Sequence, residues 1–331
     1  MLRCMTRVKS LVQKGVSRVN ISVIGLGARV AVAVGVAAGV VVTRPATAAD
    51  VDAANSVLQS GSALQSRDAD AATYVLRYKL QPGENIHYEV THTAKTKTRI
   101  NGSEETSDMS TTSRRHWDVK TAADQKMTFG HVLDKVAMTQ TTDDAPATRW
   151  DSSQSIHPPE AFAPIAEKIG TELSTITINP RGQQLDRESD TDTQTDLGMG
   201  SLTVAFPETP LKIGDSWSVP RQIRVREDNE QKVIKIRELY TLIKVRTGVA
   251  TLTVRSEPLT PINSQSVAAQ VVQHLSNGEL RFDIDAGRLI EKRLDWDENV
   301  VSFRGPNSEM NYRATLIERM VPDGQVRSAR R

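Results

Sequence analysis

Residues 211–258 read LKIGDSWSVPRQIRVREDNEQKVIKIRELYTLIKVRTGVATLTVRSEP, a run of alternating apolar and polar side chains interrupted by turn-forming residues. In its first part Trp217, Ile223 and Val225 alternate with polar neighbours, which is the two-residue period of a strand with one buried face. Pro220 lacks a backbone N–H, so we expect this strand at a sheet edge or at a bulge. The segment predicts the first strand of a β-meander.

Two further strands complete the predicted meander. Residues 232–245 are rich in Ile, Val and Leu, and their alternation slips at Leu242 and Ile243, which indicates a bulge. Residues 246–248, Arg-Thr-Gly, predict a hairpin turn into a third strand, in which every second residue from Ala250 is apolar.

The same alternation recurs on both sides of the meander and predicts a mainly β protein. Asn101-Gly102 is a hairpin signal, whereas the polar residues 103–113 and 141–155 are predicted as connections. The fold class is a β-rich α+β fold, with large antiparallel sheets in half-barrel-like lobes and one or two short helices. Strands are expected at residues 75–80, 85–100, 115–121, 127–133, 173–178, 280–284, 289–296 and 310–320.

Two segments are candidates for the helices. Pro158-Pro159-Glu160 begins a helical pattern that Gly170 ends, which predicts a helix near residues 159–169. Residues 264–276 fit a helix by their apolar spacing, but their valine content also fits a strand, so both interpretations stay open.

Two pairs of segments look alike and suggest an internal duplication. Residues 163–187 and 268–293 each run through a helical pattern, a strand, a glycine turn and a return strand. Residues 83–90 and 214–219 each join a turn glycine and an acid to a strand with an aromatic residue. Because β-proteins offer many such matches by chance, coincidence is the alternative. A duplicated chain would form two antiparallel lobes with a helix on each.

The N-terminus differs from the rest of the chain. Residues 1–48 hold basic but no acidic residues, and the apolar run 30–42 precedes the small residues at 46–48. This order predicts a secretory signal peptide cleaved between Ala48 and Ala49, and hence a periplasmic or secreted protein. A retained membrane anchor is the alternative, although the run is shorter than the about 20 residues that span a bilayer. Cys4 precedes the run and therefore cannot be a lipoprotein acylation site.

Removal of the leader changes the charge balance. The whole chain has 42 basic and 40 acidic residues, and seven of the basic ones lie in the leader, which leaves 35 against 40 and a net charge of −5. The mature chain has no basic excess, which argues against nucleic acid as a partner. It also has no cysteine, which excludes disulfides, thiol catalysis and cysteine metal sites. No membrane span is expected after cleavage.

These patterns divide the chain into segments. We expect a signal peptide (1–48), a flexible lead-in (49–74), an N-terminal β lobe (75–190), a polar linker (191–203), a C-terminal β lobe (204–320) and a polar, basic tail (321–331).

Several short phrases occur together: Trp150-Asp151-Ser152 before Pro158-Pro159, the 176–182 turn, Phe206-Pro207-Glu208 before Gly214-Asp215-Ser216-Trp217, and Phe282-Asp283 before Gly287-Arg288-Leu289. Together they resemble a family of exported bacterial proteins of unknown function with a two-lobed antiparallel β architecture. The resemblance spans about residues 75–320. Its motifs are turns and strand junctions, so it implies an architecture and no catalytic residues.

No catalytic motif accompanies this pattern. The chain has no G-x-S-x-G elbow, no H-E-x-x-H pair and no phosphate-binding loop. Its six histidines are scattered, and His87 and His92 are expected on opposite faces of one strand. The acidic run at 186–196 lacks the glycine and the distal glutamate of an EF-hand loop, so an exposed linker is favoured over a calcium site. We therefore expect no cofactor and no resident metal, and we favour a protein that is not an enzyme.

Three functional hypotheses remain. The first is a non-enzymatic extracytoplasmic binding or envelope-structural β module with a protein partner. The second is a carrier of lipid or another apolar ligand in a curved sheet. The third is a hydrolase that uses two carboxylates. For the carrier, the candidate ligand-lining residues are Phe162, Ile165, Phe206, Trp217 and Phe282, and the alternative is that they fill an ordinary core.

Overall fold

The computed structural model describes residues 72–188, 202–228, 230–275 and 277–322. The predicted leader with its cleavage site, most of the lead-in and of the linker, and nearly all of the tail lie outside these ranges. None of the helices in them is long and apolar enough to cross a membrane.

Twelve strands form one antiparallel sheet, which confirms the mainly β fold class. Along the sheet the order is β6-β5-β3-β2-β1-β12-β11-β10-β9-β8-β7, and β4 pairs with β3 beside this path. The strands are β1 (Asn85–Ile100), β2 (Ser103–Ala123), β3 (Lys126–Thr142), β4 (Thr148–Asp151), β5 (Glu172–Ile178), β6 (Gln184–Glu188), β7 (Ser216–Glu227), β8 (Glu230–Arg246), β9 (Val249–Pro258), β10 (Asn277–Asp283), β11 (Arg288–Val301) and β12 (Ser308–Met320).

The two halves of the chain meet in the middle of this sheet. β1 pairs with β12 from Tyr88↔Met320 to Ile100↔Ser308 without a register shift. The first and last long strands are therefore neighbours, and the sheet is continuous from one half of the chain to the other. The internal duplication stays a prediction.

The meander of residues 211–258 folds as its pattern predicts. β7 is the last strand of the sheet, the edge position expected for a strand with a proline such as Pro220. The register between β8 and β9 shifts between Leu242 and Lys244, which is the predicted bulge. Thr247 and Gly248 both have positive φ values, as the hairpin turn requires.

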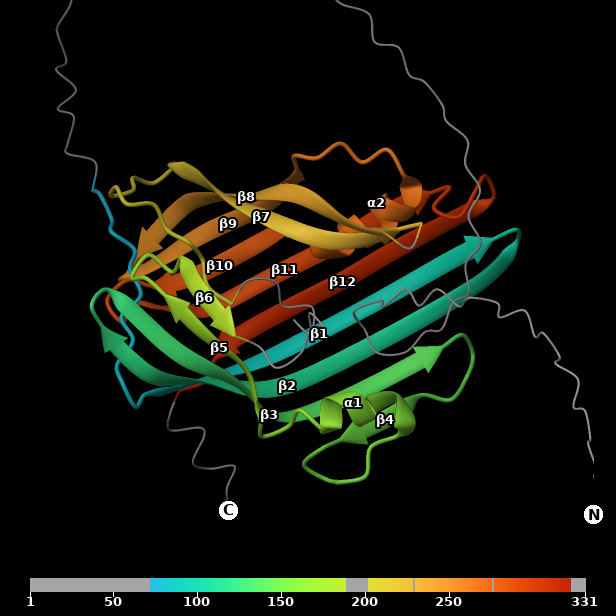
Figure 1. The fold of residues 1–331 in the computed structure, drawn as a ribbon, viewed down its shortest axis with the longest axis horizontal. Helices are drawn as coiled ribbons and strands as arrows, with labels where there is room; N and C mark the ends of the chain where they lie inside the picture. Colours follow the sequence, from blue (N-terminus) through green and yellow to red (C-terminus); the bar gives the residue numbers. More distant parts are fainter. Residues whose placement is uncertain (1–71, 189–201, 229, 276, 323–331) are drawn as a thin grey trace, which may run out of the picture.

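The sheet curls around one core. Figure 1 shows β6 and β7, the two ends of the strand order, on the same side of the middle strands β12 and β1. Ile178 of β5 and Leu242 of β8 belong to the same buried cluster, so the concave face encloses apolar side chains from across the sheet. Trp117, Phe129 and Phe282 are among its largest fully buried members. Burying this face is the main driving force for the fold.

Two extended segments close one end of the concave face, and we call them the plug: residues 74–80 and 202–211. Tyr74 and Leu211 form a β-bridge, and the backbone of Tyr78 donates to the carbonyl of Pro180. Residues 75–80 were predicted as a strand, but they make no ladder beyond that bridge. Their alternation arises because Leu76, Tyr78 and Leu80 point into the core.

Other boundaries also differ from the predictions. The polar residues 103–113 belong to β2, because there both faces of the strand are partly exposed and tolerate polar side chains. β4 lies within the predicted loop 141–155.

The helices are short. The predicted helix near 159–169 is limited to a 3-10 turn (Glu160–Phe162) and α1 (Ala163–Ala166), which has proline in its first turn. Residues 264–276, left open between helix and strand, form α2 (Gln265–Val271) and a 3-10 turn (Val272–His274). α2 packs Val267 and Val271 against apolar residues of β7 and β8.

Candidate functional site

Three of the five candidate ligand-lining residues meet at the plugged end of the concave face. The ring of Phe206 lies 4.8 Å from that of Phe282 and 6.2 Å from that of Trp217, measured between centroids. Tyr78 stacks on Phe206 at 5.7 Å, and its hydroxyl accepts a hydrogen bond from the backbone of Val204. Phe206 and Phe282 are buried among the protein's own side chains.

The other two candidates lie elsewhere. Phe162 and Ile165 belong to a separate cluster with Trp150 and the apolar residues of β3, beside α1 and β4. The five residues therefore do not line one surface, and a ligand that contacted all of them would need two sites.

Polar side chains cross the concave face next to this apolar packing. Lys292 and Glu318 form an ion pair with 2.6 Å between Nζ and Oε2, and both side chains are at most 5% exposed. Arg115, also buried, donates from Nε to the hydroxyl of Ser113 at 2.9 Å. His92 completes the row on β1.

Burial changes the ionisation of this row. Burial lowers the pKa of Arg115 to about 10, and Glu318 opposes this shift. Burial, followed by the charge of Arg115, lowers the pKa of His92, and the same two causes lower the pKa of His131 well below its usual range. Both histidines are therefore neutral at physiological pH.

Trp296 extends the polar row along β11. Its ring lies edge-on to His92, 6.4 Å between centroids. The indole Nε1 is buried, yet in the described part of the chain it has no hydrogen-bond acceptor. Met310 and Tyr312 lie in the same apolar cluster, and Ala94 and Ile100 of β1 are only partly buried against it. This part of the concave face, farther from the plug, combines apolar side chains with one unsatisfied donor.

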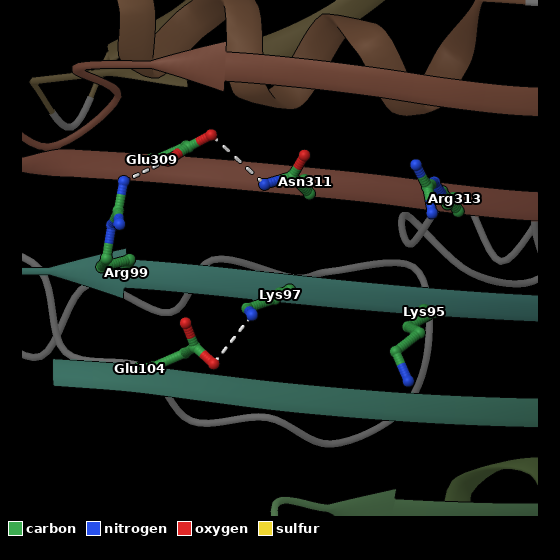
Figure 2. Close-up of a pocket in the computed structure, with 7 residues that line it drawn as sticks. All are labelled: Lys95, Lys97, Arg99, Glu104, Glu309, Asn311 and Arg313. Atoms are coloured by element: carbon green, nitrogen blue, oxygen red, sulfur yellow. Dashed lines mark hydrogen bonds and ion pairs between the residues drawn. The ribbon is translucent and has the colours of Figure 1, made fainter.

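A shallow groove of about 380 Å³ crosses β2, β1 and β12 on the opposite, convex face (Figure 2). Every cation in it already has a carboxylate partner; for example, Lys97 Nζ lies 2.8 Å from Glu104 and Arg99 Nη2 lies 2.6 Å from Glu309. Exposed pairs of this kind contribute at most about 1 kcal/mol each. The charges that line the groove are therefore paired with one another or with carboxylates beside it. It is lined by Lys95, Lys97 and Arg99 of β1, Glu104 of β2, and Glu309, Asn311 and Arg313 of β12.

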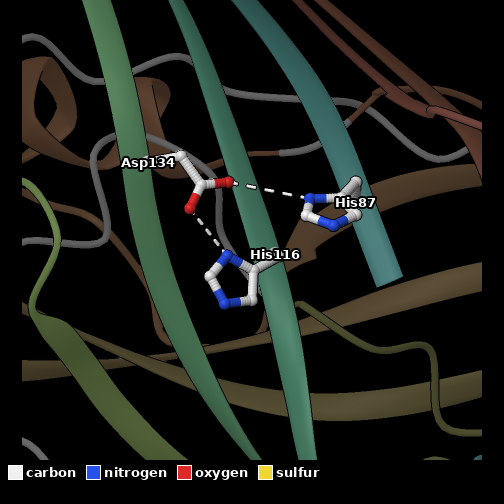
Figure 3. A group of neighbouring side chains, drawn as sticks. All are labelled: His87, His116 and Asp134. Atoms are coloured by element: carbon white, nitrogen blue, oxygen red, sulfur yellow. Dashed lines mark hydrogen bonds and ion pairs between the residues drawn. The ribbon is translucent and has the colours of Figure 1, made fainter. Parts of the chain in front are cut away.

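The convex face also holds His87, His116 and Asp134, from three neighbouring strands (Figure 3). Asp134 lies between the two rings: its Oδ1 is 2.7 Å from Nδ1 of His116, and its Oδ2 is 3.7 Å from Nδ1 of His87. The hydrogen bond to Asp134 raises the pKa of His116, against the effect of burial. The three side chains are 18–28% exposed.

The sequence does not predict this group as a whole, although part of it is readable. A two-residue Asn101-Gly102 hairpin pairs Ile100 with Ser103, and counting back from there pairs His87 with His116, as observed. The polar composition of residues 103–113 predicts a connection and thereby hides this pairing. The place of Asp134 was not readable, because Asp134 is the extra residue of a bulge in β3. The bulge lies opposite Arg114 and Arg115 of β2. His92 does face away from His87, as expected.

No protein-family model and no curated protein matches the sequence. Among solved structures, a structure of lipovitellin that describes its lipid–protein interactions aligns over 74% of this chain and 26% of its own, at 7% identity and a TM-score of 0.41. Pseudomonas aeruginosa OccK7 (OpdD) aligns over 73% of this chain and 100% of its own, at 9% identity and a TM-score of 0.24. Both likenesses are too weak to say what this chain does.

Proposed function

We propose that this chain is a non-enzymatic extracytoplasmic binding module that holds an apolar ligand with one polar acceptor against the concave face of its sheet. The observation that carries the proposal is the buried Trp296 Nε1 without an acceptor in the described residues. The leader predicted from the sequence supports the extracytoplasmic location.

An unsatisfied donor at this position is costly. Buried indole N–H groups usually find an acceptor, and leaving one unpaired costs about 1–3 kcal/mol. An oxygen atom of a ligand bound beside Trp296 would remove that cost. Specific ligand sites typically have this composition, apolar walls with a few placed polar groups.

The surroundings of Trp296 suit an apolar ligand body. Met310 and Tyr312 of β12 are buried in the apolar cluster, and the half-buried Ala94 and Ile100 of β1 are the apolar side chains there that a ligand would contact. The plug occupies the other end of the concave face, where Phe206 and Phe282 pack against each other. We therefore propose that the ligand lies against β1, β12 and β11, away from the plug, and not among the aromatic residues at the plugged end.

Titration of the delipidated protein with a fluorescent fatty acid tests the proposal. Ala94 and Lys95 are neighbours on opposite faces of β1, so Ala94→Trp adds bulk to the concave face and Lys95→Trp adds the same bulk to the convex face. We expect Ala94→Trp to abolish binding and Lys95→Trp to leave it unchanged.

Trp296→Phe keeps an aromatic ring, although a smaller one, and removes the donor. We expect it to weaken binding by roughly three- to tenfold, the value of one hydrogen bond. Equal affinities for all three variants and the parent protein would refute the concave site.

A further inference from the structure

Three adjacent strands bring two imidazoles and a carboxylate together on the convex face. His87 of β1 and His116 of β2 are directly cross-strand, and their rings lie 5.3 Å apart between centroids. On β3 the register shifts beside Arg115, and Asp134 is the residue that the shift leaves over. Bulges re-aim side chains next to functional sites, and this one aims both oxygens of Asp134 at the two histidines (Figure 3).

The distances leave room for an ion. Tetrahedral zinc with bonds of about 2.0–2.1 Å separates its ligand atoms by about 3.3 Å. His116 Nδ1 lies 2.7 Å from Asp134 Oδ1 and His87 Nδ1 lies 3.7 Å from Asp134 Oδ2, so the two distances, each to a different oxygen, fall on either side of that value. The ligand atoms of all three residues lie within 4.8 Å of one another. The three ligand atoms are therefore close enough for side-chain rotation to bring them around one ion.

One atom of the group is poorly satisfied as a purely hydrogen-bonded cluster. Asp134 Oδ2 is buried and accepts no hydrogen bond from the described residues. Its distance of 3.7 Å to His87 Nδ1 exceeds that of a hydrogen bond. A buried carboxylate oxygen without a donor is unfavourable, and a cation between it and the imidazole would satisfy it.

We propose that His87, His116 and Asp134 form a binding site for a divalent transition-metal ion, with Zn²⁺ as the expected occupant. Two imidazole nitrogens and one carboxylate oxygen are ligands that zinc accepts, and three protein ligands leave a fourth position for water or a partner's side chain. Arg114, two residues from His116 on β2, pairs with Glu89 at 4.0 Å, so its charge is partly neutralised near the site.

The test measures zinc binding to the tag-free purified chain by calorimetry, with the metal content after gel filtration as a second measurement. We expect one zinc ion per chain. Loss of one ligand in His87→Asn, His116→Asn or Asp134→Asn is expected to weaken binding at least about tenfold, because even indirect supporting residues are worth that much. His157→Asn is the matched control, since His157 is exposed in a loop outside the cluster.

Circular dichroism of each variant shows whether it is folded, and His87 and His116 are exposed enough that either asparagine variant should keep the sheet. A single ligand variant that folds and loses zinc, beside an unchanged His157→Asn protein, supports the site. Zinc binding that is absent in the parent protein, or equally strong in all variants, overturns it. The ligand site at Trp296 lies on the other face, so neither result bears on it.

Discussion

Gly182 lies where the plug packs on the turn between β5 and β6, and we expect Gly182→Ala to destabilise the protein through this packing as well as through its backbone conformation. Gly182 has a φ of +78° in the turn between β5 and β6. A Cβ at this position would collide with the carbonyl oxygen of Val204 and the ring of Tyr78, both in the plug. The hydroxyl of Thr203 donates to the carbonyl of Gly182 at 2.9 Å, so the plug packs directly on this turn.

Gly102 provides the matched control. Its φ is +86°, and nothing lies within 4 Å of the position that a Cβ would take. Gly102→Ala therefore carries only the left-handed conformational cost, about 1–2 kcal/mol. Gly182→Ala carries the same cost plus overpacking of typically 1–3 kcal/mol. We expect Gly182→Ala to lower the free energy of unfolding by about 2–5 kcal/mol.

Urea unfolding followed by tryptophan fluorescence measures both variants. Trp217 donates from Nε1 to the carbonyl of Ala205 in the plug, so its emission reports on the plugged end. We expect Gly182→Ala to shift the midpoint further than Gly102→Ala does. Equal losses of stability in the two variants would refute the packing of the plug against this turn.

Three further outcomes follow from buried and edge positions. Glu318→Gln removes the carboxylate of the 2.6 Å ion pair with Lys292. We expect the free energy of unfolding in urea to fall by about 3–5 kcal/mol, and a second substitution in the same chain, Lys292→Met, to restore most of it. No restoration would contradict the pairing. Burial lowers the folded-state pKa of His131. The fold therefore favours the neutral side chain, and stability is lost as the pH falls below the unfolded pKa of about 6.5. Stability measured against pH should fall less steeply below 6.5 in His131→Gln, and an unchanged slope would argue against a buried neutral histidine. The side chain of Gln270 binds both the backbone N–H and the C=O of Arg226 at the exposed edge of β7. We therefore expect Gln270→Ala to increase self-association in gel filtration. A variant as monodisperse as the parent would show that Gln270 does not protect the edge.

Much of the sheet was readable from the sequence because its signals are local. Pro220, the slip at Leu242–Ile243 and the Arg-Thr-Gly turn each act within a few residues, and each lies where it was predicted. Strands with one buried face can be recognised by the alternation of apolar and polar residues. Residues 103–113 could not, because the two faces of β2 there are both partly exposed.

The parts on which the two proposed sites depend were less readable because they depend on non-local register. The pairing of β1 with β12 joins residues that are more than 200 positions apart, and no local pattern specifies it. That pairing places Ala94 opposite Ala314 on the concave face and, through β11, brings Trp296 near His92. Likewise, the bulge in β3 turns its extra residue, Asp134, toward two histidines that the sequence shows only as scattered positions.

Native mass spectrometry of the protein purified from its own host, before and after organic extraction, tests the central claim most directly. A ligand held at Trp296 predicts a mass above that of the bare chain that disappears on extraction and is absent from Ala94→Trp. A bare-chain mass before extraction, in protein that keeps its fold, would contradict the proposed ligand site on the concave face.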